Sequence, residues 1–356
     1  MEGVAVMDAS VLRGKRVLIT GHTGFKGAWL ALWCEKLGAF TTGIALDPVS
    51  GRGIFGTSGI GTRVHDLRCD IRDRDRLIEL FKEERPEVVF HLAARSLVLA
   101  SYRAPVPTFD VNVMGTVNVL EAIRHTPSVR AAVMVTTDKC YENHGRREPY
   151  GETDPLGGHD PYSASKGAAE IVIAAYRRSF FSEPGAAGIA SARSGNVIGG
   201  GDWSEDRIVP DFFRALEAGR PLPIRNPGAV RPWQHVLEPL HGYLLLAAHL
   251  MAEPARFSGA WNFGPSADQV HSVRDVAEAL INITGRGSWE TIPASAHEAD
   301  LLMLNSSKAA AQLGWRPRLS FAQAMDLTVE GYLHDNTDFT ALYRSQIEQF
   351  ERLGHP

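Results

Sequence analysis

Tyr162 and Lys166 are the two side chains whose types and spacing suggest chemistry most directly. They lie four residues apart in the segment DPYSASKGAAE, so a helix there would place them on one face. An ammonium group beside a phenol favours the ionised phenol, which can then take the proton of a sugar hydroxyl. Most matches to this spacing are ordinary surface pairs, so the pair predicts a catalytic base only together with further features.

A glycine-rich turn is the first of these features. The segment RVLITGHTGFKGAWL has the order strand, turn, helix, which supports a dinucleotide site although the spacing is GxxGxxG rather than GxGxxG. Its glycines permit a tight turn, close approach of a pyrophosphate to the helix N-terminus, and packing of helix on strand. His22 is expected to be a turn residue near the pyrophosphate. The residues expected to contact the dinucleotide are Gly21, Thr23, Gly24, Phe25, Lys26 and Gly27.

Two acidic residues are candidates for the adenosine end of the cofactor. Asp47 lies 20 residues beyond the last glycine, at the end of the second predicted strand, where a carboxylate would bind the ribose hydroxyls and repel a 2′-phosphate. This favours NAD over NADP, although Asp47 is also consistent with a solvated Asp-Pro turn, and Arg52 and Arg63 leave NADP open. Asp70, next to Ile71, is a candidate adenine contact or a candidate cap of the helix that follows.

Three polar residues follow another predicted strand. Thr137, Asp138 and Lys139 lie where that strand ends, and the carboxyl ends of parallel strands face the ligand crevice. Thr137 can orient a substrate hydroxyl toward Tyr162, while Asp138 and Lys139 supply an acid and a base side by side. A polar turn that merely closes the strand is the alternative. The position favours a catalytic group, because such loops often carry one.

The order of predicted elements indicates how these residues are brought together. In the first half, strand patterns alternate with helix patterns, which indicates a parallel sheet covered on both faces. The fold class is therefore α/β, with a Rossmann-type doubly wound parallel sheet. The predicted strands are residues 15–20, 40–46, 88–93, 131–137 and 189–197, and the predicted helices are residues 28–37, 70–85 and 111–124.

The alternation breaks after about residue 190. Gly- and Pro-rich loops now separate helical stretches, which is typical of a smaller lobe built partly from insertions. We expect a Rossmann domain over residues 1–190, to which segments near 235–263 return, and a mainly substrate-binding lobe over residues 191–356. The predicted helices of this part are residues 208–218, 237–250, 273–283, 306–313 and 321–334, with a surface helix at 338–352.

Composition and charge narrow the class of protein. The chain has 356 residues, a net charge of −4 and three cysteines, which have no metal-ligand spacing. This charge gives no reason to expect nucleic acid or an anionic membrane as a partner. The first residues lack the apolar core of a signal peptide, and the apolar stretch at residues 243–250 is too short to span a bilayer. We therefore expect a cytoplasmic enzyme without a metal site.

Longer motifs add a family resemblance. The segments HLAA at residues 91–94, TTDKCYEN at 136–143, GNVIGGGDW at 195–203 and RPWQHVLEPLHGYL at 231–244, together with GHTGFKG and DPYSASKG, carry it. They resemble the CDP-D-glucose 4,6-dehydratases of the extended short-chain dehydrogenase/reductase family. The similarity runs from about residue 15 to about residue 333. Arg95 departs from the family pattern, which has glutamine after HLAA, so an extra guanidinium stands near the cofactor or substrate.

The resemblance implies a smaller C-terminal nucleotide-sugar-binding lobe, and NAD as a cofactor that is reduced and reoxidised within one turnover. It implies CDP-D-glucose as the substrate, which loses water to give CDP-4-dehydro-6-deoxy-D-glucose. Tyr162, assisted by Lys166, would take the C4 hydroxyl proton, and Asp138 would protonate the departing C6 hydroxyl. Further cofactor contacts are expected at Leu92, Ala93, Ala94 and Asn112, and contacts to the nucleotide sugar at Asn196, Arg207, Arg231 and Trp233.

Alternatives remain at this stage. The base for the C5 proton can be Lys139, Tyr162, Tyr141 or Glu142. A nucleotide-sugar C4-epimerase or another nucleotide-hexose 4,6-dehydratase would share the fold and the Tyr/Lys pair, but an epimerase needs no acid and base at C6 and C5. A non-catalytic NAD-binding regulator need not keep the reacting residues together. We expect a homodimer or homotetramer, in which the helices at 111–124 and 162–181 pair across a two-fold axis.

Overall fold

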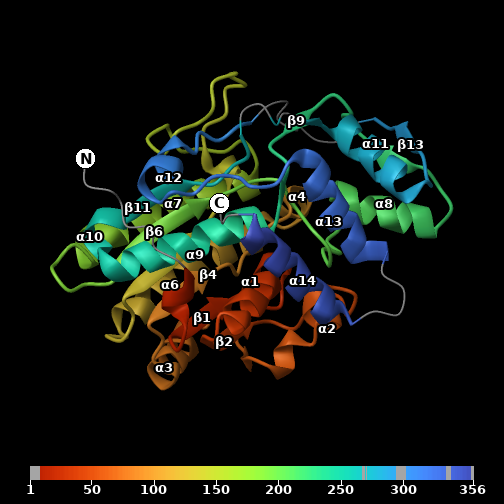
Figure 1. Ribbon diagram of the computed structural model, residues 1–356. Coiled ribbons are helices and arrows are strands. Elements are labelled where there is room, and N and C mark those ends of the chain that lie inside the picture. Colours follow the sequence, from red (N-terminus) through yellow and green to blue (C-terminus); the bar gives the residue numbers. More distant parts are fainter. Residues whose placement is uncertain (1–8, 267–268, 270, 294–301, 334–337, 354–356) are drawn as a thin grey trace.

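A computed structural model of the chain describes residues 9–266, 269, 271–293, 302–333 and 338–353. Its centre is a sheet of seven parallel strands (Figure 1). The strand order reverses beside the first strand, as in doubly wound sheets, whose ligands bind near this point at the carboxyl ends of the strands. The predicted fold class is therefore confirmed. In spatial order the strands are β3 (His65–Arg68), β2 (Phe40–Ala45), β1 (Arg16–Thr20), β4 (Val88–His91), β5 (Ala131–Val135), β6 (Gly188–Arg193) and β11 (Gly259–Asn262).

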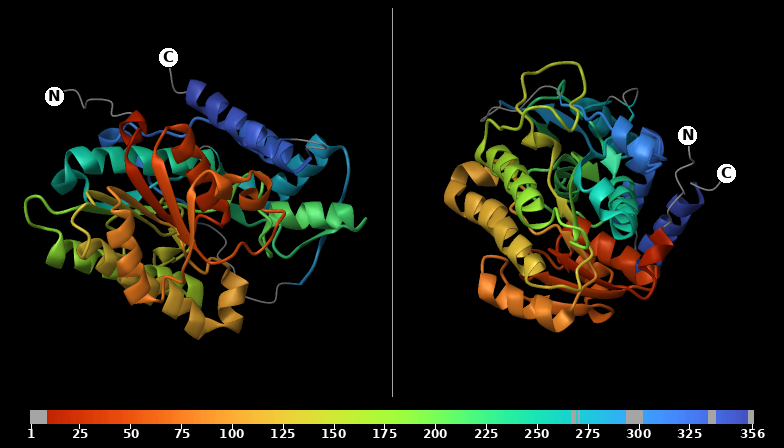
Figure 2. Two further views of the ribbon diagram at one scale, coloured as in Figure 1. Left: turned by 90° about the horizontal axis from the view of Figure 1, so that it is seen from below. Right: turned by 90° about the vertical axis from the view of Figure 1, so that its left-hand side faces the viewer.

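Helices cover both faces of this sheet. Successive strand residues point to opposite sides, so Val17 and Ile19 of β1 enter one core while Leu18 enters the other. Because both faces are buried, the strands have nearly continuous apolar sequences. Figure 2 shows the helices around the sheet from two further directions. The first core includes α1 (Phe25–Lys36) and α9 (Leu237–Ala252), and the second includes α3 (Arg74–Glu84), α6 (Gly115–Arg124) and α7 (Pro161–Phe180).

A third, smaller core lies in the C-terminal part of the chain, on the right in Figure 1. Phe212, Phe213, Leu280 and Met325 are buried together there. By contrast, α9 and β11 lie in the layers of the main sheet. The domain limits at 1–190 and 191–356 stay a prediction. The elements of the small lobe are α8 (Ile208–Glu217), β8 (Leu222–Ile224), α11 (Val273–Thr284), β13 (Trp289–Thr291) and α13 (Phe321–Leu333).

The helix predicted at residues 338–352 is present as α14 (Phe339–Arg352), which packs along α1 (Figure 2). The indole N–H of Trp33 donates to Glu351 at 2.9 Å, and the ammonium of Lys36 pairs with the same carboxylate at 2.8 Å. Arg344 forms an ion pair with Glu35. The C-terminal helix therefore braces the helix that follows the glycine turn.

Several predicted boundaries are wrong. The helix predicted from residue 70 begins at Arg74, because Asp73 caps it by accepting the Arg76 backbone N–H at 3.2 Å. The strand predicted over residues 189–197 ends at Arg193, and the chain turns at Asn196, whose φ is 45°. The sequence pattern does not predict β3, because its residues HDLR are largely polar. Residue 334, the last of a predicted helix, lies outside the described residues.

The helix predicted over residues 111–124 is a π-helix, Asp110–Met114, that continues into α6. Such π-turns are frequent at functional sites. Among the described residues, no helix is both long enough and apolar enough to cross a bilayer. The shorter elements are α2 (Ile54–Thr57), α4 (Val98–Arg103), α5 (Pro105–Phe109), β7 (Val197–Ile198), β9 (Val230–Arg231), β10 (Gln234–His235), α10 (Pro254–Phe257), β12 (His271–Ser272), α12 (Ser307–Gln312), and 3-10 turns at Ala9–Leu12, Ile60–Thr62 and Asp138–Cys140.

Candidate active site

The glycine turn between β1 and α1 has room for backbone but not for side chains. Gly21 has a φ of 78°, and a Cβ there would lie 2.7 Å from the Ala93 nitrogen. A Cβ on Gly27 would clash with the Gly21 carbonyl. Gly24 caps α1 without a side-chain hydrogen bond, so the first N–H groups of the helix are open to an anion. This arrangement fits the predicted pyrophosphate site.

Two side chains of the turn are used to hold its shape. The Thr23 hydroxyl donates to the Leu46 carbonyl at 3.0 Å, which ties the turn to the end of β2. The His22 ring is buried against Gly43 and lies 2.7 Å from Asp66. Burial lowers the pKa of His22. The side chain therefore lies against β2 and β3, and the position of His22 near the pyrophosphate stays a prediction.

Asp47 lies just beyond β2, with a side chain that is 88% exposed. Its carboxylate accepts from Nε of Arg68 at 2.8 Å. The arginine beside Asp47 is therefore Arg68. Arg52 and Arg63, which left NADP open in the sequence analysis, make other contacts. Arg52 stacks 3.6 Å from the Trp203 ring centroid, and Arg63 donates to the Ser58 carbonyl. An exposed carboxylate at this strand end fits the ribose role, which stays a prediction.

Asp70 and Ile71 follow β3. The Asp70 carboxylate is bound by the Arg72 guanidinium, which lowers the pKa of Asp70. The alternative role of Asp70 as a helix cap is wrong, because Asp73 caps α3. Ile71 is buried beneath Gly115, where a Cβ would clash with it. Ile71 thus forms a floor at this strand end, and contact with adenine stays a prediction for both residues.

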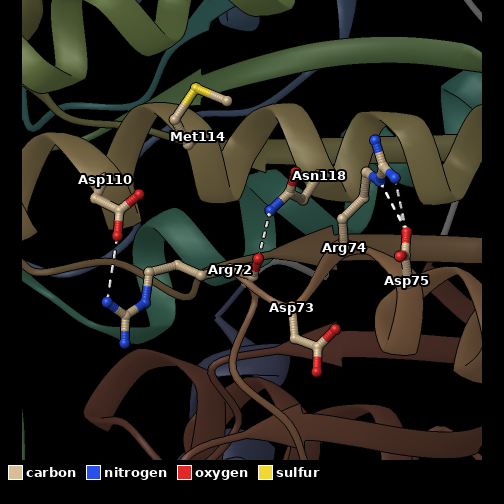
Figure 3. A pocket seen from close by; sticks show the side chains of 7 residues that line it. All are labelled: Arg72, Asp73, Arg74, Asp75, Asp110, Met114 and Asn118. Atoms are coloured by element: carbon tan, nitrogen blue, oxygen red, sulfur yellow. Dashed lines mark hydrogen bonds and ion pairs between the residues drawn. The ribbon is translucent and has the colours of Figure 1, made fainter.

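A hollow of about 450 Å³ lies beside this strand end, between the start of α3 and the π-helix. Figure 3 shows Arg72 pointing toward Asp110, at 3.2 Å, and Arg74 toward Asp75, at 2.8 Å. Its charged side chains are thus already paired within the protein. It is lined by Arg72, Asp73, Arg74, Asp75, Asp110, Met114 and Asn118. None of the predicted catalytic residues lines it.

The π-helix places Asn112 under the segment that follows β4. The Asn112 amide accepts from the Arg95 backbone N–H at 2.8 Å and donates to the Arg95 carbonyl at 3.0 Å. It also donates to the Ser165 hydroxyl on α7 at 2.8 Å. Asn112 therefore joins the end of β4 to the helix that carries Tyr162. In the same segment Ala93 N–H donates to the Thr20 hydroxyl at 3.3 Å. The cofactor contacts predicted for residues 92–94 and 112 stay predictions.

Tyr162 and Lys166 both lie on the buried face of α7. Asp160 caps this helix by accepting the Ser163 N–H at 2.9 Å, and Pro161 occupies its first position. Lys166 donates to the Val135 carbonyl at the end of β5, at 3.3 Å. Burial raises the pKa of Tyr162 to about 12. Burial lowers the pKa of Lys166 to about 8. The predicted helix and shared face are both present.

The structure brings Thr137 and Asp138 to the same place as Tyr162. Both are nearly fully buried in the turn after β5. Thr137 donates to Asp138 Oδ1 at 2.9 Å, and its hydroxyl also bonds to the Tyr162 phenol, which partly offsets the effect of burial on the pKa of that phenol. The charge of Asp138 raises the pKa of Tyr162. Gly195 leaves room for the Asp138 carboxylate, because a Cβ there would clash with it.

Lys26 reaches further than a turn residue. Its ammonium donates to the Ser194 hydroxyl at 2.8 Å and to the Tyr243 hydroxyl at 3.4 Å, and these two hydroxyls lie 2.6 Å apart. Burial and then the charge of Arg207 lower the pKa of Lys26 to about 7, and Asp138 opposes them. The sequence reasoning missed Ser194 and Tyr243. The available signal for Ser194 was its place after β6, at the same sheet edge as Thr137.

Three of the four residues predicted to contact the nucleotide sugar lie near the strands β9 and β10. Arg231 is 8% exposed and lines a small enclosed pocket with Pro149, Met303 and Leu304. The Trp233 indole donates to the His271 carbonyl at 3.1 Å. The carbonyl of Asn196 accepts from Gln234 N–H at 3.4 Å. Arg231 and Trp233 therefore both lie at the β9–β12 pair, with Asn196 beside the next residue, Gln234, and their contacts to the nucleotide sugar stay predictions.

Arg207 lies near enough to the reaction centre for its charge to act on two of the residues there. Its charge lowers the pKa of both Tyr162 and Lys26. Its own nearest carboxylate is Asp202, at 3.8 Å.

Tyr141 is one candidate base for the C5 proton. Its hydroxyl donates to the Asn262 amide oxygen at 2.8 Å, and burial raises its pKa, so the phenol keeps its proton and is not available as a base.

The rings of His91 and His235 are both buried. His91 bonds to the Thr20 hydroxyl at 2.7 Å and to the Thr116 hydroxyl at 3.1 Å. Burial lowers the pKa of each to about 3. Both rings are therefore neutral at physiological pH. Within the described ranges, no group of His, Cys, Asp and Glu side chains has the arrangement of a metal site.

Comparison with known proteins identifies the family. A sequence model of the family described as GDP-mannose 4,6 dehydratase matches residues 18–328, and the chain belongs to this family. A CDP-glucose 4,6-dehydratase of Salmonella typhimurium is 44% identical over 334 residues, which cover 91% of this chain and 92% of that protein. A dTDP-glucose 4,6-dehydratase of Xanthomonas campestris is 26% identical, with 95% of this chain and 98% of that protein covered.

Solved structures share the fold. A UDP-glucose 4-epimerase of Thermus thermophilus in complex with NAD is 27% identical, with a TM-score of 0.75 and coverage of 89% of this chain and 98% of that one. A dTDP-glucose 4,6-dehydratase of Streptomyces venezuelae with NAD and TYD bound is 24% identical, with a TM-score of 0.75 and coverage of 95% and 99%. The second likeness supports the doubly wound architecture alone.

Proposed function

We propose that this protein is a CDP-D-glucose 4,6-dehydratase, which converts CDP-D-glucose to CDP-4-dehydro-6-deoxy-D-glucose and water. The observation that carries the proposal is the buried cluster of Thr137, Asp138 and Tyr162. An alcohol oxidation needs the hydroxyl and the phenol, and an elimination at C6 needs the added acid. The 44% identical relative that bears this name supports the choice of sugar nucleotide.

NAD is the proposed cofactor, and the residues present fit it. Gly21, Gly24 and Gly27 leave room for a pyrophosphate at the open N-terminus of α1. The exposed carboxylate of Asp47 suits the hydroxyls of an adenosine ribose and disfavours a 2′-phosphate. When bound there, NAD would supply the hydride acceptor for oxidation at C4 and the hydride donor for reduction at C6.

Oxidation at C4 is the proposed role of Tyr162 and Thr137. The Thr137 hydroxyl orients the C4 hydroxyl, and the Tyr162 phenolate takes its proton. Ionising a phenol whose pKa is about 12 requires nearby positive charge. Arg207 lowers this pKa in the structure, and we assign the remaining support to Lys166 on the same helix face. Cations that surround a buried phenol shift its ionisation in this direction.

Elimination is the proposed role of Asp138 and Lys139. The Asp138 carboxyl protonates the departing C6 hydroxyl, so it must hold a proton when the ketone has formed. Tyr162 carries the C4 proton at that moment, so we assign removal of the C5 proton to Lys139, the residue next to Asp138, which would return a proton to C5 when hydride reaches C6. Glu142 is the remaining carboxylate candidate, and it packs against Gly157. A comparison of Lys139→Met with Glu142→Gln separates these two bases.

We propose that Arg231 contacts the pyrophosphate of the nucleotide. A buried guanidinium suits a pyrophosphate because it offers several N–H donors in one plane. Arg231 is buried, and the pocket beside it is lined by Pro149, Met303 and Leu304. Trp233, two residues further along the chain, borders the same strand pair. Arg207, which acts at Tyr162, is assigned to the sugar side instead.

We also propose a homodimer or homotetramer whose subunit interface includes α7 and the helical segment that begins at Asp110, as expected from the sequence, together with α5. Val106, Phe109, Met114, Ile171 and Phe180 are exposed apolar side chains on these helices and on the π-helix between them. α5, α7 and the π-helix contact one another. Ile171→Lys should shift the mass measured by light scattering to that of a monomer. Phe40→Lys, at an exposed site on β2, is the matched control and should leave the mass unchanged.

We assign the protein to the cytoplasm. Cys34, Cys69 and Cys140 are all free and buried. Free thiols of this kind suit a reducing compartment. Location of a tagged full-length chain by cell fractionation tests the assignment, and recovery with the membrane or periplasmic fraction would contradict it.

The enzyme activity is tested by product analysis. The purified protein, supplied with NAD and CDP-D-glucose, should form a 4-keto-6-deoxy sugar nucleotide, detected by mass spectrometry as the loss of one water. An epimerase would leave the mass of the substrate unchanged. A protein that binds NAD without catalysis would return the substrate intact.

A further inference from the structure

A buried ion pair lies one helical turn beyond Lys166. Glu170 on α7 and Arg193 at the end of β6 are each 3% exposed, and the Arg193 guanidinium donates to Glu170 Oε2 at 2.7 Å. A carboxylate is rarely buried to this degree unless it is paired. Burial acts to raise the pKa of Glu170, but Arg193 and the neighbouring hydroxyls outweigh it, so the net shift is downward. Glu170 is therefore a buried negative charge at neutral pH.

Hydrogen bonds fix the Glu170 carboxylate on the sheet. The Ser191 hydroxyl donates to Oε2 at 2.7 Å, and the Thr136 hydroxyl donates to Oε1. Thr136 directly precedes Thr137, and its backbone N–H donates to the Ala192 carbonyl at 2.9 Å. Glu170 thus joins α7 to the two strands whose ends carry the reacting residues.

Spacing places this charge beside Lys166. Residues 162, 166 and 170 follow one another at intervals of four along α7, so they share one face of the helix. The Lys166 ammonium has the Val135 carbonyl as its hydrogen-bond acceptor, at 3.3 Å. A carbonyl is neutral, so it does not balance the charge of a buried ammonium.

The other titratable groups around Lys166 do not supply a negative charge. His91 on β4 is neutral, because burial lowers its pKa to about 3. Burial raises the pKa of the Cys140 thiol, which is therefore neutral too. Lys26 on α1 carries positive charge when protonated, and the charge of Lys166 lowers the pKa of Lys26. Burial lowers the pKa of Lys166, and the charge of Glu170 is the largest influence that raises it.

We propose that Glu170 is a positioning residue of the reaction, whose charge keeps Lys166 in its ammonium form. This inference rests on the proposed function, in which the Lys166 ammonium supports the Tyr162 phenolate. A neutral residue at position 170 would let Lys166 lose its proton at a lower pH. Oxidation at C4 would then fail at a pH at which the wild-type enzyme still works.

The test compares Glu170→Gln with Thr136→Val in the full chain. The first change removes the charge, and the second removes one hydrogen bond to Glu170 and keeps the charge. Titration of the Lys166 side-chain nitrogen by NMR, in cofactor-free protein containing isotope-labelled lysine, gives its protonation midpoint without any turnover. We expect a midpoint lower by at least about one pH unit in Glu170→Gln, from a charge lost at helix i,i+4 distance. We expect no change in Thr136→Val.

A second readout uses the reaction. In a single turnover with CDP-D-glucose and NAD, the rate of nicotinamide reduction against pH should lose its alkaline limb at a lower pH in Glu170→Gln than in wild type. An unchanged Lys166 midpoint in a folded Glu170→Gln protein overturns the proposal, as does an equal shift in Thr136→Val. If the wild-type protein does not turn over, the proposed function fails while the NMR comparison still decides the role of Glu170.

One further variant guards against misfolding. Glu170→Gln leaves Arg193 buried without its partner, which can cost stability. The double variant Glu170→Gln/Arg193→Met removes both charges and is expected to fold, because neutral replacement of a buried pair is often tolerated. Its Lys166 midpoint should also fall, by less than in the single variant because the charge of Arg193 is removed as well, and a midpoint at the wild-type value would contradict the proposal.

Discussion

Asp138→Asn should separate oxidation from elimination. Asp138 is 2% exposed and is fixed by the Thr137 hydroxyl at 2.9 Å, so an amide of the same shape fits its site. The amide cannot protonate the C6 hydroxyl. Loss of such a general acid slows a reaction by about 10²–10⁴, which corresponds to roughly 3–5 kcal/mol in the barrier.

Oxidation at C4 should survive the same change. As the general acid, Asp138 holds its proton during oxidation, and the amide that replaces it is neutral too, so the charge beside Tyr162 should not change. Reduced nicotinamide should therefore form about as fast as in the wild-type enzyme, and it should accumulate because the next step is blocked. Stopped-flow absorbance of the reduced nicotinamide, followed together with product by mass spectrometry, measures both steps.

Gly195→Ala is the companion variant, because it keeps the carboxyl and moves it. A Cβ on Gly195 would clash with the Asp138 carboxylate, so elimination should slow here as well. If Asp138→Asn forms no reduced nicotinamide at all, Asp138 acts before or during oxidation. The division of labour between Asp138 and Tyr162 would then be wrong.

Three further outcomes are expected. Tyr162→Phe should lower the rate of nicotinamide reduction by at least about 100-fold. The affinity for CDP, measured by calorimetry, should not change. Turnover near the wild-type rate would mean that Tyr162 is not the base. Arg231→Met should raise the KM for CDP-D-glucose at least about tenfold with a smaller change in kcat, and an unchanged KM would place the pyrophosphate elsewhere. Burial raises the pKa of Glu238 from 4.5 to about 7, so the folded state holds this proton more tightly and loses about 3 kcal/mol of stability between pH 4.5 and 7. Relative to wild type, Glu238→Gln should therefore gain free energy of unfolding in urea titrations at pH 8 but not at pH 4, and parallel pH dependences would refute this.

Much of the fold follows from short-range patterns in the sequence. The β1–α1 turn is predictable because only glycine tolerates the contacts of Gly21 and Gly27. The pairing of Tyr162 with Lys166 is predictable from helix geometry alone. β3 is not, because its residues HDLR are mostly polar and its place in the sheet depends on pairing with β2. The π-helix at Asp110–Met114 is likewise invisible to a pattern based on α-helical spacing.

Site residues that directly follow a strand could be predicted from the sequence. Those that meet only through the packing of distant elements could not. Thr137 and Asp138 were placed correctly because they follow a buried strand. Arg68 beside Asp47, and Ser194 with Tyr243 beside Lys26, bring together residues far apart in the chain. Their meeting depends on strand order and helix packing, which no local spacing contains. Glu170 did have a local signal, since it lies four residues after Lys166.

The central claim is tested most directly by giving the purified wild-type protein NAD and, separately, CDP-, UDP-, GDP- and dTDP-glucose. Formation of a 4-keto-6-deoxy product is followed by the absorbance that such ketones develop in base, and the product is confirmed by the loss of one water. The proposed function, which the 44% identical relative supports, predicts fastest conversion of CDP-glucose. A galactose-configured product of unchanged mass, faster conversion of another nucleotide sugar, or no turnover of any of the four would contradict the proposed function.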